Sequence, residues 1–176
     1  LVEKAGADRF SFADTVGVLH PEKVSDIFTR LAAEIKIPIH GHFHNDFGLA
    51  TANALQAIQS GASCVDVTVN GLGERCGISS LAEVVTALDE LFNVENSWNF
   101  KILNDISSYV GKISNITDND TRPITGKNAF THNAGLHVSS VIKDGALYEP
   151  VNPKKFNRKR HHYIDKFSGK DALSYR

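Results

Sequence analysis

Apolar and polar residues alternate with two different periods along the first half of the chain. Short, largely apolar stretches have the pattern of β-strands, and each is followed by a longer amphipathic stretch with helical spacing. The predicted strands cover residues 9–14, 35–44 and 64–70. Counted from residues 9, 37 and 64, the unit repeats after 28 and then 27 residues. This regularity indicates a repeated strand and helix unit.

The amphipathic stretches cover residues 21–35, 49–61 and 78–92, and Pro21 suits the first turn of a helix. Strands that alternate with helices at this interval predict parallel strands joined by right-handed crossovers. Both a closed barrel of eight units and an open doubly wound sheet remain compatible with this pattern. Three units complete neither fold, and a parallel sheet needs cover on both faces. We therefore expect the missing units in a preceding segment or in another chain.

The periodicity changes after Phe92. A helix is predicted within residues 99–113, a polar loop follows over 114–128, and residues 130–143 again have a helical pattern. We therefore divide the chain into residues 1–92, the α/β part, and residues 93–176, a separate and mainly helical region.

Three histidines alternate in the segment HGHFHND, residues 40–46, within the second predicted strand. Alternate side chains on a strand share one face and lie about 6.5 to 7 Å apart. His42 and His44 are nearest the carboxyl end of the strand, where their rings can turn toward one cation, whereas His40 lies deeper and suits a structural role. Such a cation would be Mg²⁺, Mn²⁺ or Zn²⁺. The alternative is that all three histidines are hydrogen-bonded fillers of a barrel interior.

Five short motifs in order resemble those of the homocitrate synthase and 2-isopropylmalate synthase family: FADTVG (12–17), HFHNDFGLATAN (42–53), NGLGERCG (70–77), FTHNAGLHVSS (130–140) and YEP (148–150). The resemblance implies that residues 1–92 are the last three βα units of a (β/α)₈ barrel, followed by the beginning of a post-barrel region. It also implies an acyltransferase that condenses acetyl-CoA with a 2-oxo acid and uses a divalent metal ion.

The resemblance assigns roles to individual residues of the barrel part. His42 and His44 match the two metal-binding histidines, and Thr15 matches the threonine that binds the carboxylate of the 2-oxo acid. Glu74 matches an acid that orients the substrate, and a structural salt bridge is its alternative role. Two histidines do not complete a metal site, so a further carboxylate or amide must come from elsewhere.

In the post-barrel region the resemblance assigns acid–base chemistry to His137 and Tyr148. A histidine titrates near neutral pH, and a tyrosine hydroxyl can relay the proton. Without the resemblance, a capping histidine and a packing tyrosine are the simpler interpretation. His132 competes with His137 for the histidine role.

The choice of 2-oxo acid depends on the residue after the GERCG motif. Isopropylmalate synthases often have asparagine there, whereas this chain has Ile78, as is usual in homocitrate synthases. This favours 2-oxoglutarate as substrate and lysine biosynthesis as the pathway. The alternatives are an isopropylmalate synthase of leucine biosynthesis, a citramalate synthase, a lyase of the hydroxymethylglutaryl-CoA lyase type, and a non-catalytic metal-binding piece.

Composition adds little to this picture. Nineteen basic and twenty acidic side chains give a net charge of −1, which gives no general reason to expect nucleic acid or a membrane surface as partner. No apolar stretch approaches the roughly 18 residues of a membrane span. Two cysteines, Cys64 and Cys76, suit a reducing cytoplasm. We also expect a homodimer formed through the post-barrel region.

Overall fold

The computed structural model describes residues 2–116, 119–132 and 144–162. The chain divides into two compact units, Leu1–Val94 and Glu95–Arg176. Each unit has its own set of packed aromatic side chains.

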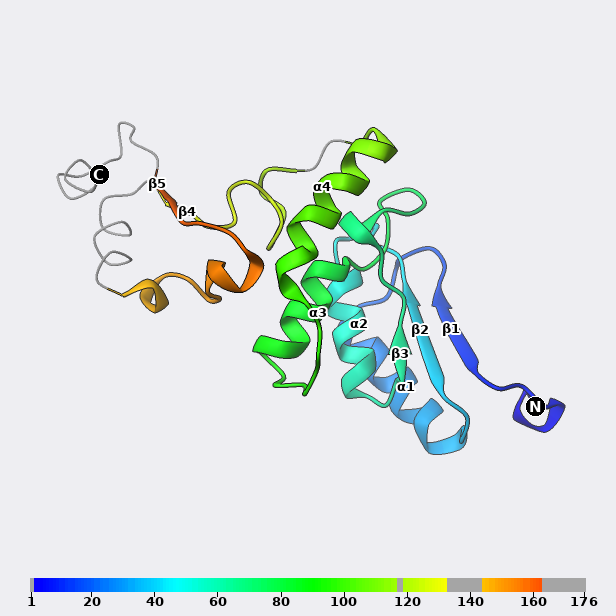
Figure 1. The fold of residues 1–176 in the computed structure, drawn as a ribbon. Helices are drawn as coiled ribbons and strands as arrows, with labels where there is room; N and C mark the ends of the chain where they lie inside the picture. The colour runs from blue at the N-terminus through cyan, green and yellow to red at the C-terminus, as the bar shows by residue number, and fades with distance from the viewer. Residues whose placement is uncertain (1, 117–118, 133–143, 163–176) are drawn as a thin grey trace. The chain divides into compact units, whose positions relative to one another are not determined.

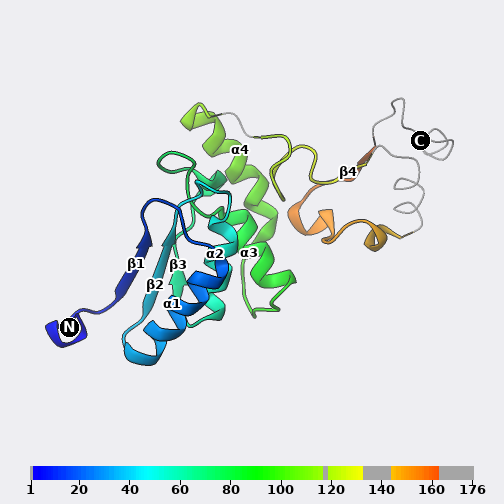
Figure 2. The ribbon, with the colours of Figure 1, turned by 180° about the vertical axis from the view of Figure 1, so that it is seen from behind.

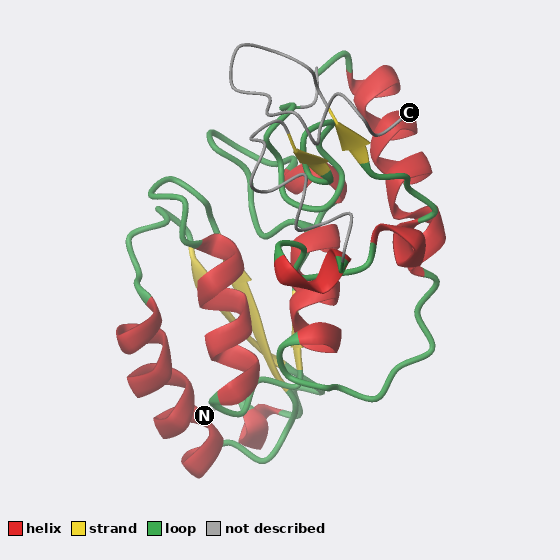
Figure 3. Ribbon diagram, turned by 90° about the vertical axis from the view of Figure 1, so that its left-hand side faces the viewer, coloured by secondary structure: helices red, strands yellow, loops and turns green. Residues whose placement is uncertain are grey.

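The first unit is a three-stranded parallel sheet with helices, in the strand order β1-β2-β3 (Figure 1). After a short 3₁₀ turn, Glu3–Ala5, the main elements are β1 (Phe10–Asp14), α1 (Pro21–Glu34), β2 (Ile39–Phe43), α2 (Ala50–Gln59), β3 (Cys64–Val65) and α3 (Leu81–Glu90). Figures 2 and 3 show α1, α2 and α3 side by side on one face of the sheet. The predicted alternation of parallel strands with helices is therefore confirmed.

The core of this unit lies between the sheet and the helices. Phe28 of α1 is fully buried, and its ring contacts those of Phe12 and Phe43, with centroids 5.6 and 5.8 Å away. The middle helix, α2, is buried through three alanines, Ala50, Ala54 and Ala57. Small residues on this face let α2 lie close to the sheet and to both neighbouring helices.

The second and third strands are much shorter than predicted, and the hydrogen bonds of the residues that flank them explain why. Before β2, the amides of Lys36 and Ile37 donate to the carboxylate of Glu3 instead of to a neighbouring strand. After β3, Asp66 N–H still donates to the Gly41 carbonyl, but Thr68 N–H bonds to Ser79 O, so the chain has left the sheet. The predicted strand over residues 64–70 is therefore reduced to Cys64–Val65.

The described part of the second unit contains one α-helix, short 3₁₀ turns and a pair of short parallel strands. Its elements are η3 (Phe100–Ile102), α4 (Leu103–Ser114), β4 (Thr131–His132), η4 (Gly145–Leu147), η5 (Pro153–Phe156) and β5 (His161–His162). A small aromatic core contains residues of η3 and η5 and the residue before β4, since the ring of Phe156 contacts those of Phe100 and Phe130. The expected mainly helical character is not confirmed by these residues.

The helix predicted over residues 130–143 is wrong where the structure describes it. Thr131 and His132 form β4, which pairs with β5, and the amide of His161 donates to the Phe130 carbonyl. The β-branched Thr131 suits an extended backbone. Residues 133–143 of this prediction lie outside the described residues. Among the described helices of both units, none has the length and apolar character to cross a membrane.

Candidate metal and substrate site

The candidate site begins on the polar face of the sheet, opposite the aromatic core. Ile39 and Phe43 of β2 belong to the core, so the alternate residues His40 and His42 point to the other face. In the parallel register Ser11 pairs with His40 and Ala13 with His42, so these side chains share that face. The alternation in HGHFH thus collects histidines away from the helices.

One carboxylate, that of Asp66 just after β3, binds two of these histidines. His40 Nε2 donates to Asp66 Oδ1 at 2.9 Å, and His42 Nδ1 donates to Oδ2 at 2.7 Å. The remaining ring nitrogen of His40, Nδ1, lies 3.1 Å from the Ser11 hydroxyl. Both ring nitrogens of the buried His40 are hydrogen-bonded, one to Ser11 and one to Asp66. These contacts are those of a structural residue.

His44 is oriented by backbone rather than by a carboxylate. Its Nδ1 donates to the main-chain carbonyl of Asp14 at 3.1 Å. The rings of His42 and His44 lie edge to face, with their centroids 4.9 Å apart. In both rings the Nδ1 proton is held by an oxygen acceptor, which leaves the lone pair on Nε2.

This tautomer fits a divalent cation. Metal-binding histidines usually donate the other ring N–H to a carboxylate or a backbone carbonyl, which fixes the ring and makes the ligating nitrogen more basic. His42 and His44 have these two kinds of partner. Among the residues that the structure describes, no three His, Cys, Asp or Glu side chains gather as a metal site. A cation held by this pair would therefore need further ligands from outside the described residues.

The electrostatics of Asp66 follow from its two partners. Partial burial raises the pKa of the Asp66 carboxyl, but the hydrogen bond from His42, together with the charge and hydrogen bond of His40, lowers it below its ordinary value overall. The carboxylate therefore remains ionised, which is the state that accepts both N–H groups.

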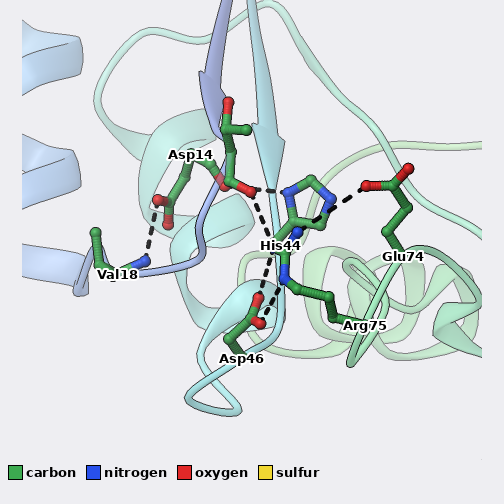
Figure 4. A network of polar contacts seen from close by, with 7 residues as sticks. Asp14, Val18, His44, Asp46, Glu74 and Arg75 are labelled. Carbon is green, nitrogen blue, oxygen red and sulfur yellow. Dashed lines mark hydrogen bonds and ion pairs between the residues drawn. The ribbon is translucent and has the colours of Figure 1, made fainter.

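A second network joins the loops at the carboxyl ends of the three strands (Figure 4). Arg75, in the loop after β3, forms a bidentate ion pair with Asp46 of the loop after β2, at 2.7 and 2.9 Å. Its Nη2 also donates to the carbonyl of Thr15, in the loop after β1, at 2.9 Å. The hydrogen bond from Arg75 is the main cause that lowers the pKa of Asp46. One guanidinium thus fixes three loops beside His44.

Hydrogen bonds within the loop after β1 also fix its conformation. The carboxylate of the buried Asp14 accepts hydrogen bonds from the amides of Val18 and Leu19, at 3.1 and 3.0 Å. Gly17 has φ +65°, and a Cβ there would meet the side chain of Asp46. The DTVG sequence therefore makes a tight turn that only glycine completes without strain.

The remaining predicted residues of the first unit lie around this network. Thr15 is exposed in the tight turn and contacts Arg75 through its carbonyl. The Glu74 side chain is 86% exposed and lies 4.0 Å from Arg75, a distance at which an exposed ion pair stabilises little. Ile78 is buried, and its backbone pairs with that of His44. An apolar, buried Ile78 cannot be a metal ligand.

In the second unit, Tyr148 lines a pocket of about 410 Å³ together with His132 and Glu149. His137, the predicted partner of Tyr148, lies outside the described residues. The nearly buried Glu149 carboxylate accepts from His132 Nε2 at 3.3 Å and pairs with both Nε and Nη2 of Arg160 at 2.6 Å. The structure therefore brings His132, the competing histidine, to the wall that Tyr148 also forms.

Sequence reasoning missed the residues that orient the histidines. Asp66 could have been found, because it lies within the predicted third strand two residues after Cys64, and Cys64 pairs with His40. The roles of Arg75 and Glu149 depend on contacts 29 and 11 residues away in sequence, which no local pattern reports.

Residues 1–110 match the family model described as HMGL-like, and residues 124–176 match the one described as homocitrate synthase post-HMGL domain-like. The homocitrate synthase of Pyrococcus horikoshii is 45% identical over 175 residues, which cover 99% of this chain and 48% of that protein. The (R)-citramalate synthase of Methanocaldococcus jannaschii is 41% identical over 174 residues, covering 99% and 35%.

The chain thus spans between about a third and a half of the length of these curated relatives. Among solved structures, the HMG-CoA lyase of Bacillus subtilis superposes with a TM-score of 0.58 at 24% identity, covering 65% of this chain and 40% of that one. At this identity the likeness concerns the fold.

Proposed function

Since the chain belongs to the HMGL-like family, we propose that it is part of an acyltransferase that condenses acetyl-CoA with a 2-oxo acid. The reaction would be a metal-assisted Claisen condensation followed by hydrolysis of the thioester, and 2-oxoglutarate is the favoured 2-oxo acid. Residues 1–92 would be the last three βα units of a (β/α)₈ barrel, and residues 93–176 the beginning of the post-barrel region.

The observation that supports this function most strongly is the paired orientation of His42 and His44. Both rings donate through Nδ1 and keep Nε2 as the ligating nitrogen, at the carboxyl end of β2. Chemistry in barrel enzymes takes place at the carboxyl ends of the strands. These two histidines would therefore hold the divalent cation, with the other ligands coming from barrel units outside this chain, from substrate and from water.

When bound, the cation would polarise the ketone of the 2-oxo acid as a Lewis acid. The chain's own residues would hold the proposed ligands and the substrate-binding turn in place for this step. Asp66 holds the ring of His42, the Asp14 carbonyl holds that of His44, and Arg75 keeps the Thr15 turn beside them. Thr15, exposed in that turn, would bind the carboxylate of the 2-oxo acid. Glu74 would orient the substrate from the same set of loops.

Proton transfer would belong to the post-barrel region. A base must remove a proton from the acetyl methyl group, and the resulting enolate attacks the ketone carbon of the 2-oxo acid. An acid then protonates the new alkoxide, and water cleaves the thioester to release CoA. We propose His137 and Tyr148 for these proton transfers, supported by their match to the family motif and by the place of Tyr148 on a pocket wall.

The buried Ile78 supports 2-oxoglutarate as substrate, because the GERCGI sequence resembles that of homocitrate synthases. The named relatives include both a homocitrate synthase and a citramalate synthase at similar identity, so a citramalate synthase is the alternative. Residues 1–110 and 124–176 both match family models, and the second model describes a homocitrate synthase domain. This second match supports a synthase over a lyase.

A substrate panel tests this proposal. CoA release from acetyl-CoA would be measured with the complete enzyme and Mg²⁺, Mn²⁺ or Zn²⁺, in the presence of 2-oxoglutarate, pyruvate or 2-oxoisovalerate. We expect the highest kcat/KM with 2-oxoglutarate. A preference for pyruvate or 2-oxoisovalerate would change the substrate but keep the reaction. No release with any of the three, or cleavage of hydroxymethylglutaryl-CoA instead, would overturn the condensing function.

A further inference from the structure

The second unit contains an ion pair that is built around one buried carboxylate. The side chain of Glu149 is 5% exposed, and a buried carboxylate is stable as an ion only when charged or hydrogen-bonding partners surround it. Arg160 provides a bidentate partner, with both contacts at 2.6 Å. The glycine at position 145 leaves space for this pair, because a Cβ there would collide with the guanidinium of Arg160.

This ion pair has a third member. His132 on β4 contacts Glu149 through Nε2 at 3.3 Å, and its side chain is 12% exposed. A carboxylate accepts but does not donate, so Nε2 carries the proton and the lone pair of a neutral ring is on Nδ1. The pairing of β4 with β5 brings Arg160, the residue before β5, next to the histidine. The fold therefore fixes both the position and the tautomer of His132.

The fixed histidine forms part of a pocket. His132, Glu149 and Tyr148 line the same cavity of about 410 Å³, together with apolar and polar residues from the loop before β4. Tyr148 is 41% exposed and directly precedes Glu149. One side of the pocket thus combines a hydroxyl that can relay a proton with a histidine held by a carboxylate.

We propose that Glu149, held by Arg160, is a positioning residue that fixes His132 in this pocket, and that His132 acts there beside Tyr148 in the proton transfers of the condensation. This inference rests on the proposed function and adds Glu149 and His132 to it, so that His132 takes part in these proton transfers in addition to His137. A carboxylate that holds a histidine in one tautomer is a recurring device of acid–base catalysis. The same role explains why Arg160 pairs with Glu149 and why a glycine occupies position 145.

Two variants test the proposal in the complete enzyme. Glu149→Gln keeps the shape of the side chain but removes its charge, and His132→Asn removes the imidazole while leaving the Glu149–Arg160 pair in place. We expect each to lower kcat by about 100-fold, within the range of a positioned acid–base group, with the KM for the 2-oxo acid changed less than about twofold. Matched controls are Glu95→Gln and His161→Asn, at exposed positions of the same unit, which should keep the wild-type kcat.

A spectroscopic readout separates positioning from catalysis. Long-range ¹H–¹⁵N NMR of the wild-type protein should show His132 as the Nε2–H tautomer near neutral pH, and Glu149→Gln should convert it to a mixture. A folded His132→Asn protein with kcat within about twofold of wild type would overturn the proposal, as would an unchanged tautomer in Glu149→Gln. A wild-type enzyme that condenses nothing would overturn the proposed function, while the NMR result would still decide whether Glu149 orients His132.

Discussion

His42 donates its Nδ1 proton to the carboxylate of Asp66 over 2.7 Å. The bond joins β2, at whose carboxyl end both predicted metal ligands lie, to the segment that follows the neighbouring strand β3. Asp66 binds His40 with its other oxygen, so one side chain fixes two rings. The orientation of the proposed metal site therefore depends on a residue that is not itself a proposed ligand.

Replacing Asp66 tests this dependence. Asp66→Asn keeps the size of the side chain but exchanges one carboxylate oxygen for an amide nitrogen that cannot accept from a histidine. Loss of such a partner typically weakens metal binding by about 10- to 100-fold, and we expect a decrease of this size for Mn²⁺. Titration followed by electron paramagnetic resonance of free Mn²⁺ measures it, with Asp26→Asn on the exposed side of α1 as control. An unchanged affinity would show that Asp66 does not act through His42.

Arg75 should hold the three loops around His44 in a fixed arrangement. Arg75→Lys keeps the charge but cannot form a bidentate pair with Asp46 and also reach the Thr15 carbonyl. We expect faster amide hydrogen exchange in residues 15–18 and a several-fold higher KM for the 2-oxo acid. Arg30→Lys on α1 is the matched control. Exchange rates equal to those of wild type would mean that the loops keep their arrangement without this side chain.

The Glu149 pair predicts a pH dependence of stability. Burial raises the pKa of the Glu149 carboxyl, but hydrogen bonds and charges of Arg160 and His132 lower it below the ordinary value of 4.5 overall. A lowered folded-state pKa means that the stabilisation is complete above the unfolded value and is lost as the pH falls through the folded value.

We therefore expect the melting temperature to fall more steeply in the wild-type protein than in Glu149→Gln between neutral pH and acid. Thermal unfolding recorded at a series of pH values measures this difference, with Glu95→Gln as the control that should follow wild type. Parallel curves for wild type and Glu149→Gln would contradict the lowered pKa of this carboxyl.

Two phenylalanines of the first unit should differ sharply in their contribution to stability. Phe28 is fully buried between the rings of Phe12 and Phe43, whereas Phe47 is 72% exposed. Truncation of a buried phenylalanine to alanine costs about 3 to 5 kcal/mol, and we expect this for Phe28→Ala. Phe47→Ala should change the free energy of unfolding by less than about 0.5 kcal/mol. Urea unfolding compares the two, and similar losses would show that the core is elsewhere.

The hydrophobic periods of the sequence predicted the order and type of the elements in the first unit, because each helix and strand there buries one face on a common core. They did not predict where β3 ends, because the exit of the chain at Thr68 depends on hydrogen bonds with Ser79 and with Leu81, the first residue of α3. The helical pattern near residue 130 failed because pairing with His161, some 30 residues later, determines the backbone there.

In the candidate site, too, the local sequence pattern predicted some residues, and contacts with neighbouring strands determine the others. Alternation and position on the strand indicated His42 and His44, because chemistry in barrel enzymes takes place at the carboxyl ends of the strands. The residues that hold them, Asp66 and the Asp14 carbonyl, come from neighbouring strands. Sequence spacing shows which side chains share a face, but only the register of adjacent strands shows which of them touch.

The central claim is that His42 and His44 hold the metal for a condensation of acetyl-CoA with a 2-oxo acid. It is tested most directly by the rate of CoA release that depends on 2-oxoglutarate, compared between wild type, His42→Ala, His44→Ala and the exposed control His20→Ala. We predict that wild type and His20→Ala release CoA at equal rates and that both other variants lose the 2-oxoglutarate-dependent release. Retention of this release in His42→Ala and His44→Ala would contradict the claim.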